Sequence, residues 1–267
     1  MKIFDVHCHI YPDKIADKAV ENIGRFYNVT MQGSGTAQNL LQQQQEAGIA
    51  GSLVYAVALK ASNVQSINDF IAGQAKQHPS LIGFATMHQD YEDMEAEIDR
   101  CIKLGLKGVK IHPDSQGVNA DDPRLMRLYE IIQGRLPLVL HCGDYRWDNS
   151  HPSRIKSILR AFPKLVLNAA HFGGWSLYDL AVEYLEDENC FMDISSASAY
   201  LGPRRTTELI HIYGPERILF GSDYPMWKPQ EEVERFMANN LTPKEQQMIC
   251  WHNAERFVGM DLAAALG

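Results

Sequence analysis

The stretch Lys2-Ile3-Phe4-Asp5-Val6-His7-Cys8-His9 opens the chain with a short apolar run that ends in two histidines. A run of this length and composition predicts a buried β-strand. Alternate side chains of a strand lie on one face, so the imidazoles of His7 and His9 are expected on the same face, roughly 6.6 Å apart along the chain. Two imidazoles placed in this way can bind the same cation.

Seven further short apolar runs follow, and a segment with helical periodicity comes after each of them. The run at 136–140 is typical of a parallel strand covered by helices. Eight βα units in 267 residues predict an α/β protein, a closed (β/α)8 TIM barrel that forms a single domain over residues 1–267. The strands are expected near residues 2–7, 51–57, 81–86, 107–112, 137–142, 165–171, 190–195 and 217–222.

An open, doubly wound sheet is the alternative architecture. That fold would place a glycine-rich phosphate loop after the first strand, whereas this chain has His-Cys-His-Ile-Tyr-Pro at residues 7–12. We therefore favour the closed barrel. The segment near residues 10–36 is longer than an ordinary βα loop, so we expect an extended loop or lid beside the substrate.

Two helix boundaries can also be predicted. The apolar periodicity between Tyr91 and Gly105 indicates a helix that ends at the glycine. The sequence Thr242-Pro243-Lys244-Glu245 is a capping box with proline at the first helical position, and it should begin the last long helix.

Composition restricts the partners of the chain. It has 33 acidic and 25 basic residues, a formal net charge of -8, and no cluster of lysine and arginine suited to phosphates. Nucleic acid is therefore not expected as a partner. Neither a membrane span of 18 or more apolar residues nor a signal peptide is indicated. Five widely spaced cysteines suit a reducing compartment, so we expect a cytoplasmic protein. Since nucleic acid and membranes are not expected as partners, the expected partner is a small molecule.

Residues that bind metals or carry charge end several of the expected strands. In a TIM barrel these strand ends form the active site. Imidazole and carboxylate ligands suit Zn²⁺ best, although other divalent first-row ions fit as well, and three or four protein ligands plus water indicate a catalytic site. The residues concerned are His7, His9, Lys110, His112, His141, His171 and Asp223.

Six segments, taken in order, resemble the amidohydrolase superfamily, specifically its amidohydrolase-2 branch related to aminocarboxymuconate semialdehyde decarboxylase. They are DVHCH at 5–9, GVKIHP at 108–113, LHCG at 140–143, AHFGG at 170–174, LFGSDYP at 219–225 and NAERF at 253–257. The resemblance spans nearly the whole chain and implies a (β/α)8 barrel. It implies that the positions of His7, His9, His141 and Asp223 bind the metal. The position of His171 typically contacts the nucleophilic water or a second ion.

Lys110 fits two states. In two-metal relatives a lysine at the end of the fourth strand is carboxylated and bridges the ions, whereas one-metal relatives lack that bridge. A lysine with a lowered pKa in a dry pocket would take up carbon dioxide, and an ammonium group would orient an anionic substrate. One Zn²⁺ ion is favoured, with two ions as the alternative if Lys110 is carboxylated. Many relatives are dimers, so a homodimer is an open alternative by analogy.

The favoured function is that of a metal-dependent hydrolase acting on a C–N or C–O bond of a small, carboxylate-bearing molecule. In this hypothesis the ion lowers the pKa of water toward about 7. Asp223 accepts the proton and passes it to the leaving group, while His171 orients the water and stabilises the oxyanion. A non-oxidative decarboxylase of an aromatic or unsaturated carboxylic acid is the alternative, and a barrel that binds without turnover is the third hypothesis.

Four further residues are candidates for contact with the substrate, and each has a structural alternative. Arg146 either clamps a carboxylate or pairs with a neighbouring aspartate. His112 either contacts the substrate or shapes the loop that follows it. Trp175 and Tyr224 either line the pocket or cover the barrel rim. The remaining histidines are expected to be structural or solvated: His78, His88, His151, His211 and His252.

Overall fold

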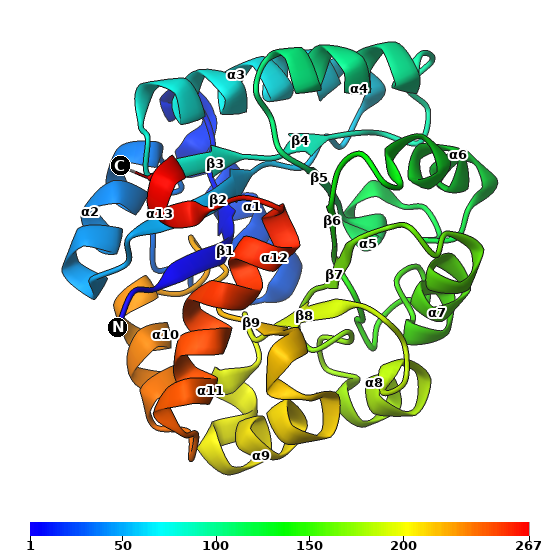
Figure 1. The fold of residues 1–267 in the computed structure, drawn as a ribbon. Helices are drawn as coiled ribbons and strands as arrows, with labels where there is room; N and C mark the ends of the chain where they lie inside the picture. Colours follow the sequence, from blue (N-terminus) through cyan, green and yellow to red (C-terminus); the bar gives the residue numbers. More distant parts are fainter. Residues whose placement is uncertain (267) are drawn as a thin grey trace.

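The computed structural model describes residues 1–266, and its centre is a barrel of parallel strands (Figure 1). Each of the eight strands expected from the sequence is present, and the third is divided into two short pieces on either side of Phe84. The strands are β1 (Phe4–His9), β2 (Gly51–Tyr55), β3 (Leu81–Gly83), β4 (Ala85–Thr86), β5 (Val109–Ile111), β6 (Leu138–Leu140), β7 (Leu167–Ala169), β8 (Phe191–Asp193) and β9 (Ile218–Leu219).

The strands pair in chain order and the series closes on itself. The first three are paired in the order β1-β2-β3, and the remainder in the order β4 to β9, all in parallel. The backbone N–H of Phe84 donates to the carbonyl of Val54 at 3.0 Å, which joins the two series. The backbone N–H of Val6 donates to the carbonyl of Phe220 at 3.0 Å, which closes the barrel. The predicted (β/α)8 barrel is confirmed, and closure excludes the open sheet.

Helices surround the barrel as a ring (Figure 1). The predicted helix between residues 91 and 105 is α4 (Met94–Lys103). The predicted capping box is formed, because the side chain of Thr242 accepts from the backbone N–H of Glu245 at 3.3 Å and its own N–H donates to that glutamate at 2.7 Å. The other helices of eight or more residues are α1 (Asp13–Tyr27), α2 (Ala37–Ala47), α3 (Val64–Gln77), α6 (Pro123–Ile132), α7 (Pro152–Ala161), α8 (Tyr178–Leu185), α9 (Ser198–Tyr213) and α10 (Pro229–Met237).

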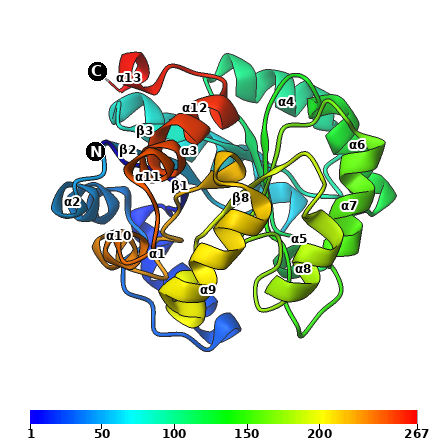
Figure 2. The ribbon, with the colours of Figure 1, turned by 60° about the horizontal axis from the view of Figure 1, so that its bottom comes forward.

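Short helical segments complete the chain at both ends of the barrel. α1 lies at one end, and the C-terminal segments lie at the other (Figure 2). None of the helices described is both long and apolar enough to be a membrane span. The short segments are η1 (Ala61–Asn63), α5 (Pro113–Gln116), η2 (Pro215–Arg217), α11 (Pro243–Gln247), the π-helix η3 (Met248–His252), α12 (Asn253–Val258) and α13 (Leu262–Ala265).

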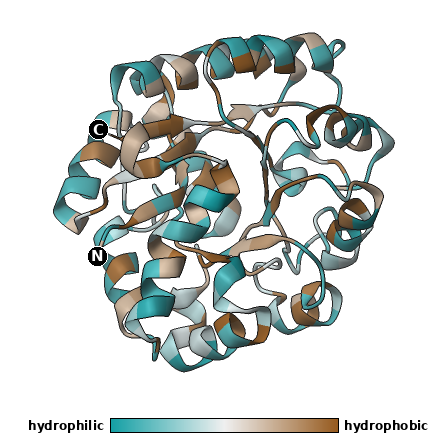
Figure 3. Cartoon of the chain, in the orientation of Figure 1, coloured by the Kyte–Doolittle hydropathy of each residue, from teal (hydrophilic) through white to brown (hydrophobic). Residues whose placement is uncertain are grey.

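Two apolar layers form the core. One fills the barrel and its end beside the C-terminal segments, where Phe4, Leu53 and Leu219 pack with Trp251 and Phe257. The other lies between the strands and the surrounding helices. Apolar residues follow the strands, while polar residues follow the outer faces of the helices (Figure 3). Burial of both layers is the main stabilising contribution to such a fold.

A β-bulge in β1 sets the direction of the first two histidines. The side chain of Val6 packs inside the barrel, whereas Cys8 packs in the layer outside it. The register with β2 shifts between Asp5 and Cys8, which breaks the ordinary alternation of the strand. Such an extra residue re-aims the side chains that follow it. His7 and His9 consequently both point toward the barrel axis.

Candidate active site

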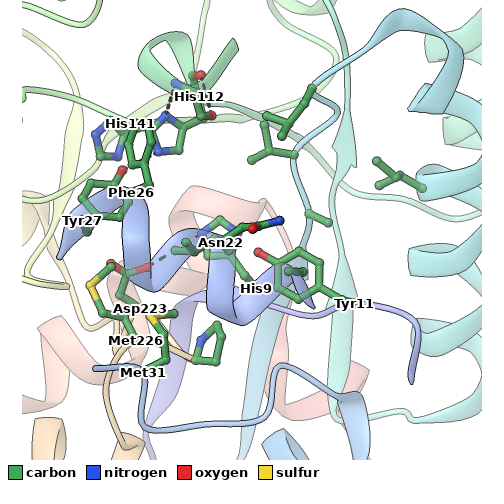
Figure 4. Close-up of a pocket in the computed structure, with 18 of the residues that line it drawn as sticks. His9, Tyr11, Asn22, Phe26, Tyr27, Met31, His112, His141, Asp223 and Met226 are labelled. Carbon is green, nitrogen blue, oxygen red and sulfur yellow. Dashed lines mark hydrogen bonds and ion pairs between the residues drawn. The ribbon is translucent and has the colours of Figure 1, made fainter. Parts of the chain in front are cut away.

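A cavity of about 680 Å³ opens at the carboxyl ends of the strands, where the fold predicts an active site. Figure 4 shows the labelled histidines and Asp223 gathered around this cavity, with residues of α1 beside them. Six of the seven residues expected at the strand ends line the cavity: His7, His9, His112, His141, His171 and Asp223. The seventh, Lys110, lies directly beneath and contacts His7.

His7 is oriented by a buried carboxylate. Its Nδ1–H donates to Oδ2 of Asp193 at 3.0 Å, so the lone pair is on Nε2, which lies 3.3 Å from Nζ of Lys110. The same Nε2 lies 3.5 Å from Oδ1 of Asp223. Burial alone would raise the pKa of Asp193, but His7, His171 and Ser195 hold it well below its ordinary value. Asp193 is therefore a fixed negative charge behind His7, an arrangement typical of metal-binding histidines.

His171 and His141 face one another. Nδ1 of His171 donates to the carbonyl of Ser195 at 2.9 Å, and Nε2 of His141 donates to the carbonyl of Gly143 at 3.1 Å. Burial lowers the pKa of His171 to about 4 and the pKa of His141 well below its ordinary value, so both rings are neutral near pH 7. Their remaining nitrogens, 3.1 Å apart, each present a lone pair to the other.

Asp223 and His9 complete the group. Oδ2 of Asp223 accepts from the hydroxyl of Ser196, which in turn accepts from the indole N–H of Trp227 at 2.9 Å. Oδ1 faces Nε2 of His9 at 3.8 Å. The buried Nδ1 of His9 has no hydrogen-bond partner among the residues described.

The donor set fits a divalent metal ion. The ligand atoms of His7, His171 and Asp223 lie within 4.8 Å of one another. Two facing lone pairs repel unless a cation lies between them, and two nitrogens bound to one tetrahedral zinc lie about 3.3 Å apart, close to the separation of His141 and His171. Neutral imidazoles and a carboxylate are ligands that first-row divalent ions prefer.

Lys110 is held in the barrel interior. It is fully buried, its ammonium donates to Nε2 of His7 at 3.3 Å, and it lies over the ring of Tyr55 at 5.1 Å. Burial lowers its pKa to about 8, against the opposing effect of Asp193 and Asp223.

Strained backbone accompanies the site residues. His171 has a φ of 59° and Asp223 a φ of 60°, and Ser196 has a φ of 51°. Residues other than glycine adopt this left-handed conformation rarely, and such strain gathers at functional sites. The conformation lies at the ends of β7, β8 and β9, where it turns these side chains over the barrel mouth.

Comparison with protein families shows the family to which this chain belongs. The model of the Amidohydro_2 family, described as amidohydrolase, matches residues 4–260. The chain belongs to the amidohydrolase family. Members of this family are enzymes, decarboxylases and hydrolases among them. A search of curated proteins gave no match.

Solved structures similar to this amidohydrolase-family chain cover nearly all of it. An uncharacterized TIM-barrel protein from Bordetella bronchiseptica is 20% identical, with a TM-score of 0.75 and 100% of each chain covered. A dihydroxybenzoic acid decarboxylase from Polaromonas sp. JS666, with bound manganese and the inhibitor 2-nitroresorcinol, is 17% identical, with a TM-score of 0.75 and 97% of each chain covered. A proposed 2-pyrone-4,6-dicarboxylic acid hydrolase from Pseudomonas putida is 18% identical, with a TM-score of 0.66, and covers 96% of this chain and 97% of its own. At these identities the similarity shows the shared fold alone.

Two of the expected substrate contacts line the cavity of this amidohydrolase-family protein. Trp175 lies at the cavity wall. His112 both lines the cavity and caps α5, where its Nδ1 accepts from the backbone N–H of Ser115 at 3.3 Å. Its Nε2–H therefore donates to the hydroxyl of Tyr27 at 2.7 Å. Both interpretations of His112 thus have support in the structure.

The other two expected contacts, Arg146 and Tyr224, are not among the residues that line the cavity. Arg146 makes two hydrogen bonds to the carboxylate of Asp144, at 2.9 and 2.7 Å, and a third to the carbonyl of Phe26 at 2.5 Å. Its guanidinium is thus already paired. The hydroxyl of Tyr224 donates to Asn39 at 2.9 Å, which directs the ring toward the start of α2. These contacts favour the structural alternative for both residues.

The five histidines expected to be structural lie outside the cavity lining. His211 pairs with Glu245 at 3.1 Å, and His252 pairs with Glu255 at 3.2 Å. His151 caps the start of α7 by accepting from a backbone N–H. The contacts of these three histidines agree with that expectation.

Sequence reasoning missed the residues that orient the donors. Asp193 ends a strand just as Asp223 does, so the same signal could have found it. Asp114 lies 3.5 Å from His141, and burial raises its pKa to about 6. The position of Tyr27 follows from the direction of α1, for which the sequence contains no signal.

Proposed function

We propose that this protein is a metal-dependent hydrolase that cleaves a C–N or C–O bond at the carbonyl group of a small molecule. The observation that carries the proposal is the convergence of imidazole nitrogens and one carboxylate oxygen at the cavity floor. The family includes hydrolases and decarboxylases, which supports an enzymatic role for this site.

One divalent ion, Zn²⁺ by preference, would be held by His7, His9, His141 and Asp223, with His171 beside them. When bound, such an ion polarises a carbonyl group and lowers the pKa of water. Asp193 and Asp223 oppose the lowering of the Lys110 pKa, so we propose one ion and an uncarboxylated lysine, whose hydrogen bond to Nε2 of His7 would give way to the ion. Elemental analysis of purified protein should give about one equivalent of metal.

Asp223 is the proposed proton carrier. Ser196 fixes one of its oxygens, so the other, Oδ1, faces the site, where it would contact both the ion and the attacking water. It would take a proton from the attacking water and deliver it to the leaving group, a role that typically contributes a factor of 10² to 10⁴ in rate. The strained backbone at Asp223 keeps that oxygen over the barrel mouth.

His171 is proposed to orient water rather than to donate to an oxyanion. Its single proton is used on the carbonyl of Ser195, and burial keeps the ring neutral by lowering its pKa to about 4. The free Nε2 can therefore only accept a hydrogen bond or bind a cation. Of the two roles expected from the sequence, orienting the water is kept and stabilising the oxyanion is not.

Replacing Asp223 with Asn tests the assignment. We expect a folded protein whose kcat falls at least about 100-fold, because the amide cannot accept the proton. Circular dichroism and metal content report on folding and loading. Asp179→Asn, which changes an exposed aspartate on α8, is the matched control. Full activity in the Asp223 variant would remove Asp223 from the mechanism.

Decarboxylation of an aromatic or unsaturated acid is the second candidate. The largely apolar cavity wall supports it, because a site with little water disfavours the localised charge of a carboxylate relative to the charge spread over the ring or double bonds as carbon dioxide leaves. The fold shared with a manganese-containing dihydroxybenzoic acid decarboxylase adds support. A panel of amides, esters and lactones assayed for hydrolysis, beside benzoic acids assayed for carbon dioxide release, separates the two reactions.

A further inference from the structure

The cavity is larger than the reacting group requires. An engineered apolar cavity of about 150 Å³ is enough to hold benzene, whereas this cavity measures about 680 Å³. Volumes of roughly 300 to 1,000 Å³ are typical of sites that take drug-sized molecules. There is therefore room for more than one ring beyond a carbonyl or carboxyl group placed at the donors.

The wall away from the histidines is mostly apolar and is formed by two helices, which also contribute Lys18, Asn22 and Ser66. Ile15, Ala19 and Ile23 succeed one another at intervals of four residues, so they share one face of α1. Ile67 and Phe70 contribute from α3. A long apolar group would bury this surface, which favours binding.

The apolar surface continues to the mouth of the cavity. Ile15 is 52% exposed and Leu59 is 58% exposed, and both line the cavity. Large aliphatic side chains this exposed at the edge of one pocket are typical of a surface that a ligand covers. The shape thus favours a ligand that extends from the donors to the opening.

Cationic groups along this wall are scarce. Among the described residues that line the cavity, Lys18 is the only lysine or arginine, and it is exposed on α1. Arg146 is bound to Asp144, and Lys110 lies below the cavity beside His7. A second carboxylate on the ligand would lose its hydration without gaining a buried partner, which is costly. An ion pair with the exposed Lys18 would add little to the binding affinity.

We propose that the substrate carries its reacting carbonyl or carboxyl group on an extended apolar group of more than one ring, or of equivalent length, with no second anionic group along it. This inference rests on the proposed function only in placing the reacting group at the donor set, and it holds for hydrolysis and decarboxylation alike. It also narrows the carboxylate-bearing substrate expected from the sequence to one whose acid group, if present, is at the reacting end.

Binding of product-like acids tests the proposal without any need for turnover. Isothermal titration of the purified protein supplied with Zn²⁺ would compare benzoate, biphenyl-4-carboxylate and biphenyl-4,4′-dicarboxylate. We expect biphenyl-4-carboxylate to bind at least tenfold more tightly than benzoate, and the added distal carboxylate to remove most of that gain. Equal binding of benzoate and biphenyl-4-carboxylate would overturn the extended apolar group. Undiminished binding of the dicarboxylate would overturn the restriction to one anionic group.

Variants of α1 locate the effect. Ala19→Phe fills the wall and should weaken biphenyl-4-carboxylate at least tenfold while leaving benzoate unchanged. Ile15→Asn, at an exposed position that folding tolerates, should weaken it severalfold. Lys14→Phe, exposed on the same helix and outside the lining, is the control and should change neither. If both wall variants bind biphenyl-4-carboxylate like the unmodified protein, the wall is not the binding surface. Tight binding without catalysis would leave this inference standing and count against the proposed reaction.

Discussion

At the scale of single residues, the site depends on which nitrogen of each histidine carries the proton. A carboxylate behind His7 and a carbonyl behind His171 fix one proton on each ring and aim the other nitrogen at the cavity. Asp193 does this for His7 from the barrel interior, where its side chain also accepts from Asn168 at 2.8 Å. The orientation of the donors is thus built into the strands before any ion binds.

Asp193→Asn should therefore weaken metal binding without unfolding the barrel. The amide N–H of the asparagine can donate to Nδ1 of His7, which would move the ring proton to Nε2, the nitrogen that would bind the ion. Loss of a side chain that orients a metal ligand typically costs 10- to 100-fold in metal affinity. Competition for Zn²⁺ with a chromogenic chelator measures the change, with Asp179→Asn as the control. An unchanged affinity in a folded Asp193→Asn protein would contradict the role.

The sequence predicts the donors better than their surroundings. His7, His9 and Asp223 could be identified because each follows an apolar run, and parallel strands bring such positions to one end of a barrel. The environment of Arg146 could not, because its bond to the carbonyl of Phe26 joins segments 120 positions apart. The environment of Tyr224 could not be predicted for a similar reason, since its hydroxyl bonds to the distant Asn39.

At the scale of elements, α1 is fastened across the cavity at its C-terminal end. Arg146 donates to the carbonyl of Phe26 and lies 4.2 Å from the ring centre of Trp147, which stacks on Phe26 at 4.9 Å. The hydroxyl of Tyr27 bonds to His112. The last turn of α1 is therefore tied to the loops after β5 and β6.

Removing the arginine should loosen that turn. We expect Arg146→Met to speed amide exchange at residues 24–27 by about tenfold or more, because a charged hydrogen bond contributes about 1.5 to 3 kcal/mol. The double variant Arg146→Met/Asp144→Asn controls for the buried carboxylate left behind. Arg205→Met, a surface arginine paired with Asp179, should leave α1 unchanged. Unaltered exchange in both Arg146 variants would show that α1 is held by other contacts.

Strands were predictable at this scale because burial on both faces leaves a continuous apolar run in the sequence. The capping box at Thr242 was predictable because it is local. The bulge in β1 was not, since it depends on pairing with β2 and on hydrogen bonds to the last strand. The path of α1 over the cavity likewise depends on contacts with distant loops.

At the scale of the whole molecule, one buried acid outside the cavity lining should couple stability to pH. Glu232 on α10 is 1% exposed and bonds to Arg235. Burial raises its pKa from 4.5 to about 7, Arg235 opposes this, and Asp223 and Asp5 add to it. Between pH 4.5 and about pH 7, Glu232 of the folded protein binds a proton that the unfolded chain has released. The free energy of unfolding therefore falls as the pH rises through this range.

Glu232→Gln should remove this contribution. The free energy of unfolding of the variant, relative to the unmodified protein, should increase by up to about 3 kcal/mol from pH 4.5 to pH 8. Urea denaturation at several pH values measures the difference, and Glu234→Gln, on the same helix, is the control. A difference that stays constant across the window would mean that Glu232 does not titrate there.

The bulge in β1 limits how the metal-binding pair can be transplanted. A designer who copies His-Cys-His into a regular strand of another barrel would obtain two imidazoles on the outer surface, facing the helices, if the strand keeps its ordinary alternation from Phe4. Moving this chemistry to a new scaffold therefore requires the irregular hydrogen-bonding pattern as well as the residues. A strand shortened by one residue, to Phe-Asp-His-Cys-His, would keep both imidazoles on the inner face without the bulge, because they would then alternate regularly with Phe4.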